Sequence, residues 1–386
     1  MSLDFDQTIP REGTASVKHD GRAAYFGTAD VTPLWVADMD FAAPPAVTAA
    51  LVARAAHPIY GYTRYPDSLY DALIVWMQQR HGWSVEREWI IMCPGVVPSL
   101  HAAVMAFAQA GEGVIVQPPV YFPFFSAVTS SARRLIENPL RLIDGRYQID
   151  FEHLEHCAAN GAKLLLLCSP HNPVGRVWQH DELSEILRIA RQHKLVVLSD
   201  EIHADLVYPG QQHTPLAILA DASDSVISAV APSKSFNIPG LGLSCLIIPN
   251  PEQRSAMSKV FASLHVSASN PFSIVAFEAA YREGGAWLDA LMAYLQTTRD
   301  FVLDYAHRYL PGIQPVAPQG TYLIWLDCRG LQLDDKALRD FFVHQAKLGM
   351  NPGIVFGTGG SGFMRLNLAS PWQVIAAALV RVRELL

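Results

Sequence analysis

The stretch Leu164-Leu-Leu-Leu-Cys168-Ser-Pro-His-Asn172-Pro-Val-Gly175 opens with an unbroken apolar run and ends in turn residues. Apolar runs of this kind are typical of strands that are covered on both faces. Similar runs lie at Leu195–Ser199 and Val226–Val230, and Asp181–His193 between the first two runs has the periodicity of an amphipathic helix. Further strands are expected over Val114–Gln117 and Leu243–Ile248, and a further helix over Ser99–Gln109. Strands that alternate with helices predict an α/β fold with a mostly parallel sheet.

The pattern changes near Gly284. Beyond it we expect a long helix over Trp287–Leu310, a strand over Thr321–Asp327 and amphipathic helices on each side of Gly349–Gly362. A chain of 386 residues is long enough for more than one hydrophobic core. The predicted parts are an N-terminal segment over 1–38 that packs on the small domain, a large domain over 39–283 with helices flanking its sheet, and a smaller α+β domain over 284–386.

The composition argues against several classes of protein. A formal net charge of -7 disfavours a general nucleic-acid binder, which needs a basic face. The N-terminal residues lack the features of a secretory signal, and no apolar run approaches the roughly 20 residues of a membrane span, so we expect a cytoplasmic protein without membrane contact. Five cysteines without a C-x-x-C pair predict buried thiols. His153 and His156 have no third ligand, so no metal site is expected.

Three polar side chains follow shortly after the ends of three predicted strands. They are Asn172, Asp200 and Lys234. Singly they would be a turn residue, a helix cap and a solvated lysine, but ligands of parallel sheets bind beyond the carboxyl ends of the strands, where all three should meet. A lysine amine can form an imine with an aldehyde, a buried carboxylate can keep a pyridine nitrogen protonated, and an amide can donate to a phenolate oxygen. This combination is what pyridoxal 5′-phosphate requires of a protein.

A phosphate group also needs a binding site. The segment Cys93–Pro98 opens a predicted helix, and its backbone N–H groups suit an anion. Tyr121 follows another predicted strand, where its ring could stack on the cofactor. The glycine-rich stretch Gly357–Gly362 lacks the strand-loop-helix context of a dinucleotide site, so we expect no such role for it.

Over essentially its whole length the chain resembles the class I/II aminotransferase superfamily of fold-type I pyridoxal-phosphate enzymes. Within it, the chain is most similar to the MalY/PatB group of cystathionine β-lyase-like C–S lyases, and Leu34–Phe41 is the segment most specific to that group. The other matching motifs are Phe5-Asp6, Arg11–Thr14, Tyr60–Tyr62, the Gly95 segment, the three motifs around Asn172, Asp200 and Lys234, Gly320–Asp327 and Phe363–Asn367. The resemblance implies a homodimer with active sites at the subunit interface.

The resemblance also implies roles for single residues. Lys234 would hold the cofactor as a Schiff base and act as acid and base at the substrate Cα, and Asp200 would pair with the pyridine nitrogen. Arg365 would bind the substrate α-carboxylate, which suits a bidentate guanidinium. Asn172 would contact the ring oxygen, with His203 nearby, and Tyr121 would stack on the ring and is also a catalytic candidate. The implied phosphate contacts are Gly95, Val96, Val97 and Ser233. Tyr62 would reach the phosphate of the neighbouring subunit. The other implied substrate contacts are Trp35, Val36, Asn172 and Tyr60, the last of which could also reach that phosphate.

Some positions depart from the superfamily pattern. Ala231 and Gly242 stand where many relatives have a hydroxyl and an arginine for the phosphate, so the site should depend on Ser233 and backbone groups. We identify no second arginine for a side-chain carboxylate, which disfavours an aspartate-type transaminase. The motifs do not choose between β-elimination of a thiolate and transfer of the amino group. The resemblance favours a C–S β-lyase, the alternative is an aminotransferase for neutral or aromatic amino acids, and a third hypothesis is a regulatory protein that retains the fold.

Overall fold

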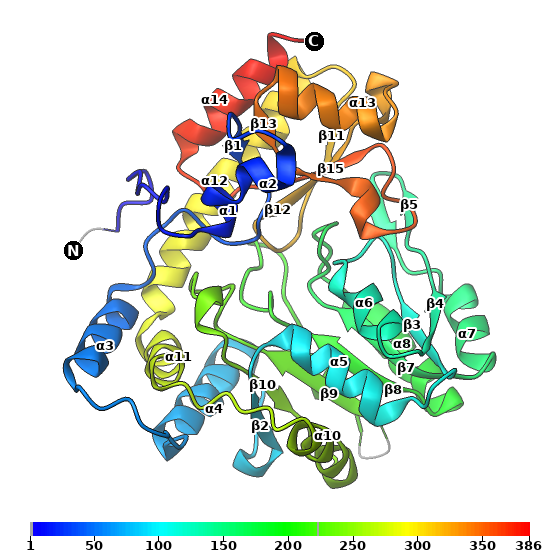
Figure 1. Ribbon diagram of the computed structural model, residues 1–386. Helices are drawn as coiled ribbons and strands as arrows, with labels where there is room; N and C mark the ends of the chain where they lie inside the picture. Colours follow the sequence, from blue (N-terminus) through cyan, green and yellow to red (C-terminus); the bar gives the residue numbers. More distant parts are fainter. Residues whose placement is uncertain (1–2, 222–223) are drawn as a thin grey trace.

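The computed structural model describes residues 3–221 and 224–386, and a seven-stranded sheet lies at its centre (Figure 1). The strands, in spatial order, are β2 (Ile90–Cys93), β10 (Ser244–Ile247), β9 (Val226–Val230), β8 (Val196–Asp200), β7 (Ala162–Cys168), β3 (Gly113–Val116) and β4 (Arg134–Glu137). The strands from β9 to β4 pair in parallel, whereas β10 runs antiparallel to both of its neighbours. The mostly parallel sheet predicted from the apolar runs is therefore confirmed.

The bounds of most elements lie within two residues of the sequence prediction. The largest difference is at α5 (Val96–Phe107), which begins three residues before the predicted Ser99. Gly95 has a φ of 135°, a conformation that residues with a side chain rarely adopt. Because of this sharp turn, α5 starts almost directly after β2, and its first N–H groups face the edge of the sheet where β8 and β9 end.

Helices cover both faces of the large sheet. In β7, Leu164 and Leu166 pack into a core cluster with α5, α6 (Pro123–Thr129) and α10 (Pro251–Ser263). Leu165 and Leu167 pack into a second cluster with α7 (Phe151–Ala159) and α8 (His180–His193). Because both faces are covered, successive residues of the strand are all apolar, which is why this run could be recognised in the sequence.

A second sheet, of four antiparallel strands, lies in the C-terminal part of the chain. Its order is β11 (Gln314–Val316), β12 (Leu323–Asp327), β15 (Phe363–Asn367) and β14 (Asn351–Pro352). The N-terminal β1 (Thr32–Pro33) pairs in parallel with β13 (Leu348–Gly349), and Figure 1 shows the N-terminal helices α1 (Val17–Asp20) and α2 (Arg22–Phe26) beside this part of the chain. The N-terminal segment thus lies against the C-terminal part.

The domain limits after residues 38 and 283 stay a prediction. Gly284 joins α11 (Pro271–Glu283) to the long α12 (Gly285–Tyr309), and one hydrophobic cluster runs from Phe5 to Val382 across both limits. The remaining helices and strands are α3 (Pro45–Ala56), α4 (Asp67–His81), α9 (Leu216–Leu219), α13 (Asp335–Asp340), α14 (Trp372–Arg383), β5 (Arg141–Ile143) and β6 (Arg146–Gln148). Within the described ranges, no helix has the length and apolar character needed to cross a membrane.

Candidate active site

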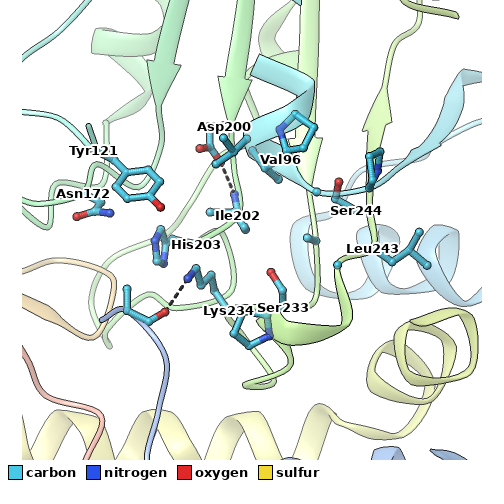
Figure 2. Close-up of a pocket in the computed structure, with 18 of the residues that line it drawn as sticks. Val96, Tyr121, Asn172, Asp200, Ile202, His203, Ser233, Lys234, Leu243 and Ser244 are labelled. Carbon is cyan, nitrogen blue, oxygen red and sulfur yellow. Dashed lines mark hydrogen bonds between the residues drawn. The ribbon is translucent and has the colours of Figure 1, made fainter. Parts of the chain in front are cut away.

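A cavity of about 280 Å³ lies at the carboxyl ends of β7, β8 and β9, beside the first turn of α5 (Figure 2). The predicted site residues that line it are Gly95, Val96, Val97, Tyr121, Asn172, Asp200, His203, Ser233 and Lys234. The three side chains that follow successive parallel strands therefore do meet at one rim, as the sequence predicts.

Asp200 is the last residue of β8 and is almost completely buried. Its Oδ1 accepts a hydrogen bond from the backbone N–H of Ile202 at 3.2 Å (Figure 2). Burial raises the pKa of this carboxyl to about 7, although that hydrogen bond and the charge of Lys234 oppose the increase. A protonated ring nitrogen would be a cationic partner for this buried carboxylate, so Asp200 fits the pyridine end of pyridoxal phosphate.

Lys234 lies beyond the end of β9, and its Nζ donates to the carbonyl oxygen of Ala37 at 2.6 Å (Figure 2). Burial, together with the charge of Arg365, lowers the pKa of this amine to about 8. The neutral amine that attacks an aldehyde is therefore far more populated than in a solvated lysine. The hydroxyl of Tyr322 donates to the same carbonyl at 2.8 Å, so one backbone oxygen orients both side chains.

Another group of lining residues suits an anion. It contains the first turn of α5, whose free N–H groups carry partial positive charge, and the residues Ser233 and Ser244. Ala231 and Gly242 line the cavity without adding a polar side chain, and Lys234 is the only lysine or arginine among the described lining residues. A phosphate would be held here by N–H groups and hydroxyls, in agreement with the departures noted in the sequence.

Tyr121, Asn172 and His203 lie across the cavity from Leu243 and Ser244 (Figure 2). The backbone N–H of Tyr121 donates to the carbonyl of Asn172 at 3.1 Å, which fixes the two loops relative to each other.

His203 is buried, and burial lowers its pKa to about 3, so its imidazole is neutral. The Nδ1 atom of His203 has no hydrogen-bond partner among the described residues, and no hydrogen bond joins the ring to Asp200 there. This unpartnered atom is a fitting contact for a polar group of a ligand.

Arg365, on β15, is buried beside the cavity and contacts three neutral oxygens. Its Nη1 donates to Oδ1 of Asn172 at 3.0 Å, and its Nη2 donates to Oδ1 of Asn351 at 2.7 Å and to the carbonyl of Trp35 at 2.8 Å. Its Nε is buried without a partner in the described part of the chain. Burial lowers the pKa of Arg365 to about 10, which leaves it charged at neutral pH. A buried cation with an unused N–H group is suited to a carboxylate.

Five predicted site residues do not line the cavity. They are Arg365, which lies beside it, and Tyr60, Tyr62, Trp35 and Val36. Tyr60 and Tyr62 are exposed on the connection between α3 and α4, where the hydroxyl of Tyr60 donates to the carbonyl of Ala55. The ring of Trp35 stacks on Tyr25 with centroids 4.2 Å apart, and Val36 packs against the same cluster. The segment that holds Trp35 and Val36 therefore contributes backbone carbonyls near the site, and their neighbour Ala37 lines the cavity.

Sequence reasoning missed Ala37, Tyr322 and Asn351. Ala37 contacts Lys234 through its backbone carbonyl, and a backbone contact leaves no pattern in the sequence. Asn351 reaches the site because β14 pairs with β15 so that Asn351 lies opposite Arg365. The Tyr322 hydroxyl approaches Ala37 across 285 positions of sequence. Tyr322 lies within Gly320–Asp327, one of the motifs that match the family, and this motif is the feature of the sequence that points to it.

The similarity of the chain to known proteins agrees with this geometry. A model of the family "Aminotransferase class I and II" matches residues 29–381. Cystathionine beta-lyase PatB of Bacillus subtilis is 42% identical over 386 residues, which is 100% of both chains, and protein MalY of Escherichia coli is 34% identical over 96% of this chain and 95% of its own. The crystal structure of cystalysin from Treponema denticola, which contains pyridoxal 5′-phosphate, has a TM-score of 0.96 at 39% identity and covers 100% of this chain and 98% of its own.

These relatives match nearly the whole chain at identities of 34% to 42%, and the fold and the predicted group are both confirmed. The chain therefore belongs to the class I and II aminotransferase family, in the group that contains PatB and MalY.

Proposed function

We propose that this chain is a pyridoxal-phosphate-dependent C–S β-lyase. Its substrate class is an amino acid with a thioether at Cβ, and one molecule of water converts it into pyruvate, ammonia and a thiol. The observation that carries the reaction class is the 42% identity to the cystathionine β-lyase PatB over the full length of both chains. The cofactor assignment is supported by the cavity that brings together Lys234, Asp200 and the first turn of α5.

Pyridoxal phosphate, when bound, supplies an electron sink next to the substrate Cα. Asp200 would support that role, because a nearby carboxylate would keep the ring nitrogen protonated. Asn172 and His203 line the same cavity, and the Asn172 amide and the neutral His203 ring would hydrogen-bond the polar ring substituent. Tyr121 also lines the cavity, and its aromatic ring would stack on the cofactor ring.

Arg365 and Lys234 act on the substrate itself. Arg365 binds the α-carboxylate and so fixes the orientation of the bonds at Cα, which is the positional contribution to catalysis. Lys234 would hold the cofactor through its side-chain amine, and that amine in its neutral form would remove the proton from the substrate Cα. The thiolate leaves from Cβ with the electron pair of the broken C–S bond, and the ammonium of Lys234 is a proton source within the site.

The assembly that we propose is a homodimer in the cytoplasm. Tyr60 and Tyr62 support this proposal because both side chains are exposed on this chain, away from its own cavity. An exposed tyrosine pair is suited to a neighbouring subunit, where a phenol hydroxyl could donate to the phosphate.

The test is a product assay on cofactor-loaded protein with L-cystathionine and no keto acid. Sustained release of pyruvate, ammonia and thiol is expected. If release stops and resumes only as amino-group transfer after a keto acid is added, the protein is an aminotransferase and the proposal is wrong. Lys234→Ala is the matched control, since it removes the reacting amine and leaves the rest of the cavity in place.

A further inference from the structure

The guanidinium of Arg365 is held only by neutral acceptors in the described part of the chain. They are the side-chain oxygens of Asn172 and Asn351 and the carbonyl oxygen of Trp35, all within 3.0 Å. No carboxylate there lies within ion-pair distance of Arg365. A buried cation is strongly destabilising unless an anion reaches it, so the positive charge stays available for a ligand.

Asn351 is the acceptor whose side-chain orientation is fixed by a second hydrogen bond, on the side away from Arg365. It is buried, its Oδ1 accepts from Arg365 at 2.7 Å, and its Nδ2 donates to the hydroxyl of Tyr25 at 3.3 Å. Tyr25 is itself held by its ring, which stacks on Trp35. Because the amide nitrogen is engaged by Tyr25, the amide oxygen faces the guanidinium.

A neutral amide and a carboxylate at this position would act differently. The amide fixes the guanidinium without cancelling its charge. An aspartate of nearly the same shape would form a buried ion pair, and the substrate carboxylate would then have to compete with it. The identity of one side-chain atom at position 351 thus decides whether Arg365 is free to receive an anion.

We propose that Asn351, oriented by Tyr25, is a positioning residue that holds Arg365 ready for the α-carboxylate and leaves its charge uncompensated. The inference rests on the proposed function only in that the ligand is an amino acid. It makes Asn351 a determinant of selectivity for amino acids over amines that lack a carboxylate. A merely structural role, as one more residue of β14, would not discriminate between these two ligands.

The test compares L-alanine with ethylamine as probes of the cofactor-loaded protein. Binding is followed by the change in cofactor absorbance, so turnover is not needed. In Asn351→Asp, the Kd for L-alanine is expected to rise roughly 100-fold, as for loss of hydrogen bonds to a charged group, and the Kd for ethylamine to stay within about twofold. An unchanged Kd for L-alanine, or an equal loss for both probes, would overturn the proposal.

Two further variants keep the test decisive. Asn351→Ala removes the acceptor without adding charge, and about a tenfold rise in the Kd for L-alanine alone is expected. This variant decides the matter if the aspartate variant does not fold. Tyr25→Phe keeps the ring stack and removes the hydroxyl, and a smaller rise of roughly threefold is expected. An unchanged Kd in Tyr25→Phe would remove Tyr25 from the proposal.

Failure of the proposed lyase activity can be told apart from failure of this inference. If the wild-type protein releases no thiol from L-cystathionine but shows the predicted contrast between the two probes, the proposed function is wrong and the role of Asn351 stands.

Discussion

Asp200→Asn tests whether the buried, ionised Asp200 carboxylate destabilises the folded protein when no cofactor is bound. The substitution keeps the shape of the side chain and removes its charge. In the cofactor-free chain, burial raises the pKa of Asp200 from 3.8 to about 7, so the folded state favours the protonated carboxyl. The stabilising effect of that proton is fully present below pH 3.8 and is lost as the pH rises through about 7.

The size of the effect follows from this pKa. The folded chain binds nearly one proton more at Asp200 than the unfolded chain at pH 5, and about half a proton more at pH 7. As the pH rises through this interval, its free energy of unfolding therefore falls relative to that of Asp200→Asn. Integrated over this interval, the difference between the two proteins changes by about 2 kcal/mol in favour of the variant. Lys234 contributes little to the difference here because its own pKa is about 8, above the interval.

The assay is denaturant unfolding of both cofactor-free proteins at pH 5, 6 and 7. A difference in unfolding free energy that does not change with pH would refute the reasoning. In the cofactor-loaded protein the effect reverses, because the amide cannot balance a protonated ring nitrogen. Asp200→Asn is therefore expected to bind the cofactor more weakly and to turn over more slowly.

Three further predictions concern the two cationic side chains. Lys234→Ala is expected to show no covalent cofactor after borohydride reduction and mass spectrometry, and a retained adduct would exclude Lys234 as the attachment site. The rate of covalent uptake of pyridoxal phosphate by the cofactor-free protein is expected to rise about tenfold per pH unit below pH 8 and then to level off. The reason is that the neutral amine of Lys234, whose pKa is about 8, is the reactive form. A stopped-flow absorbance profile without this plateau would contradict the assignment. Arg365→Lys keeps the charge but loses the planar fork, so kcat/KM for an amino acid is expected to fall roughly 100-fold, mainly through KM, and steady-state kinetics with an unchanged KM would place the carboxylate elsewhere.

The parts of the site that the sequence could predict are those that depend on a local rule. Asn172, Asp200 and Lys234 were recognisable because each follows an apolar run, and the carboxyl ends of neighbouring parallel strands must share an edge of the sheet. The early start of α5 was missed because it depends on the backbone conformation of Gly95, which the amino-acid type permits but does not impose.

The parts that escaped prediction depend on how distant elements meet. Asn351 lies opposite Arg365 through the register of β14 and β15, and no periodicity in the sequence specifies that register. The family pattern placed Trp35 at the substrate pocket, but its ring stacks on Tyr25 and its carbonyl instead reaches Arg365. Side-chain direction in an irregular segment follows from the packing around it, so it becomes visible only in three dimensions.

The most direct test of the central claim is to count the molecules of pyruvate formed per Lys234 site from L-cystathionine in the absence of any keto acid. A β-lyase regenerates its cofactor in every cycle, so the account predicts many molecules of pyruvate per site and an equal amount of ammonia. A yield that stops at about one keto acid per site, and that resumes only when a second keto acid is supplied, would contradict the account and identify an aminotransferase.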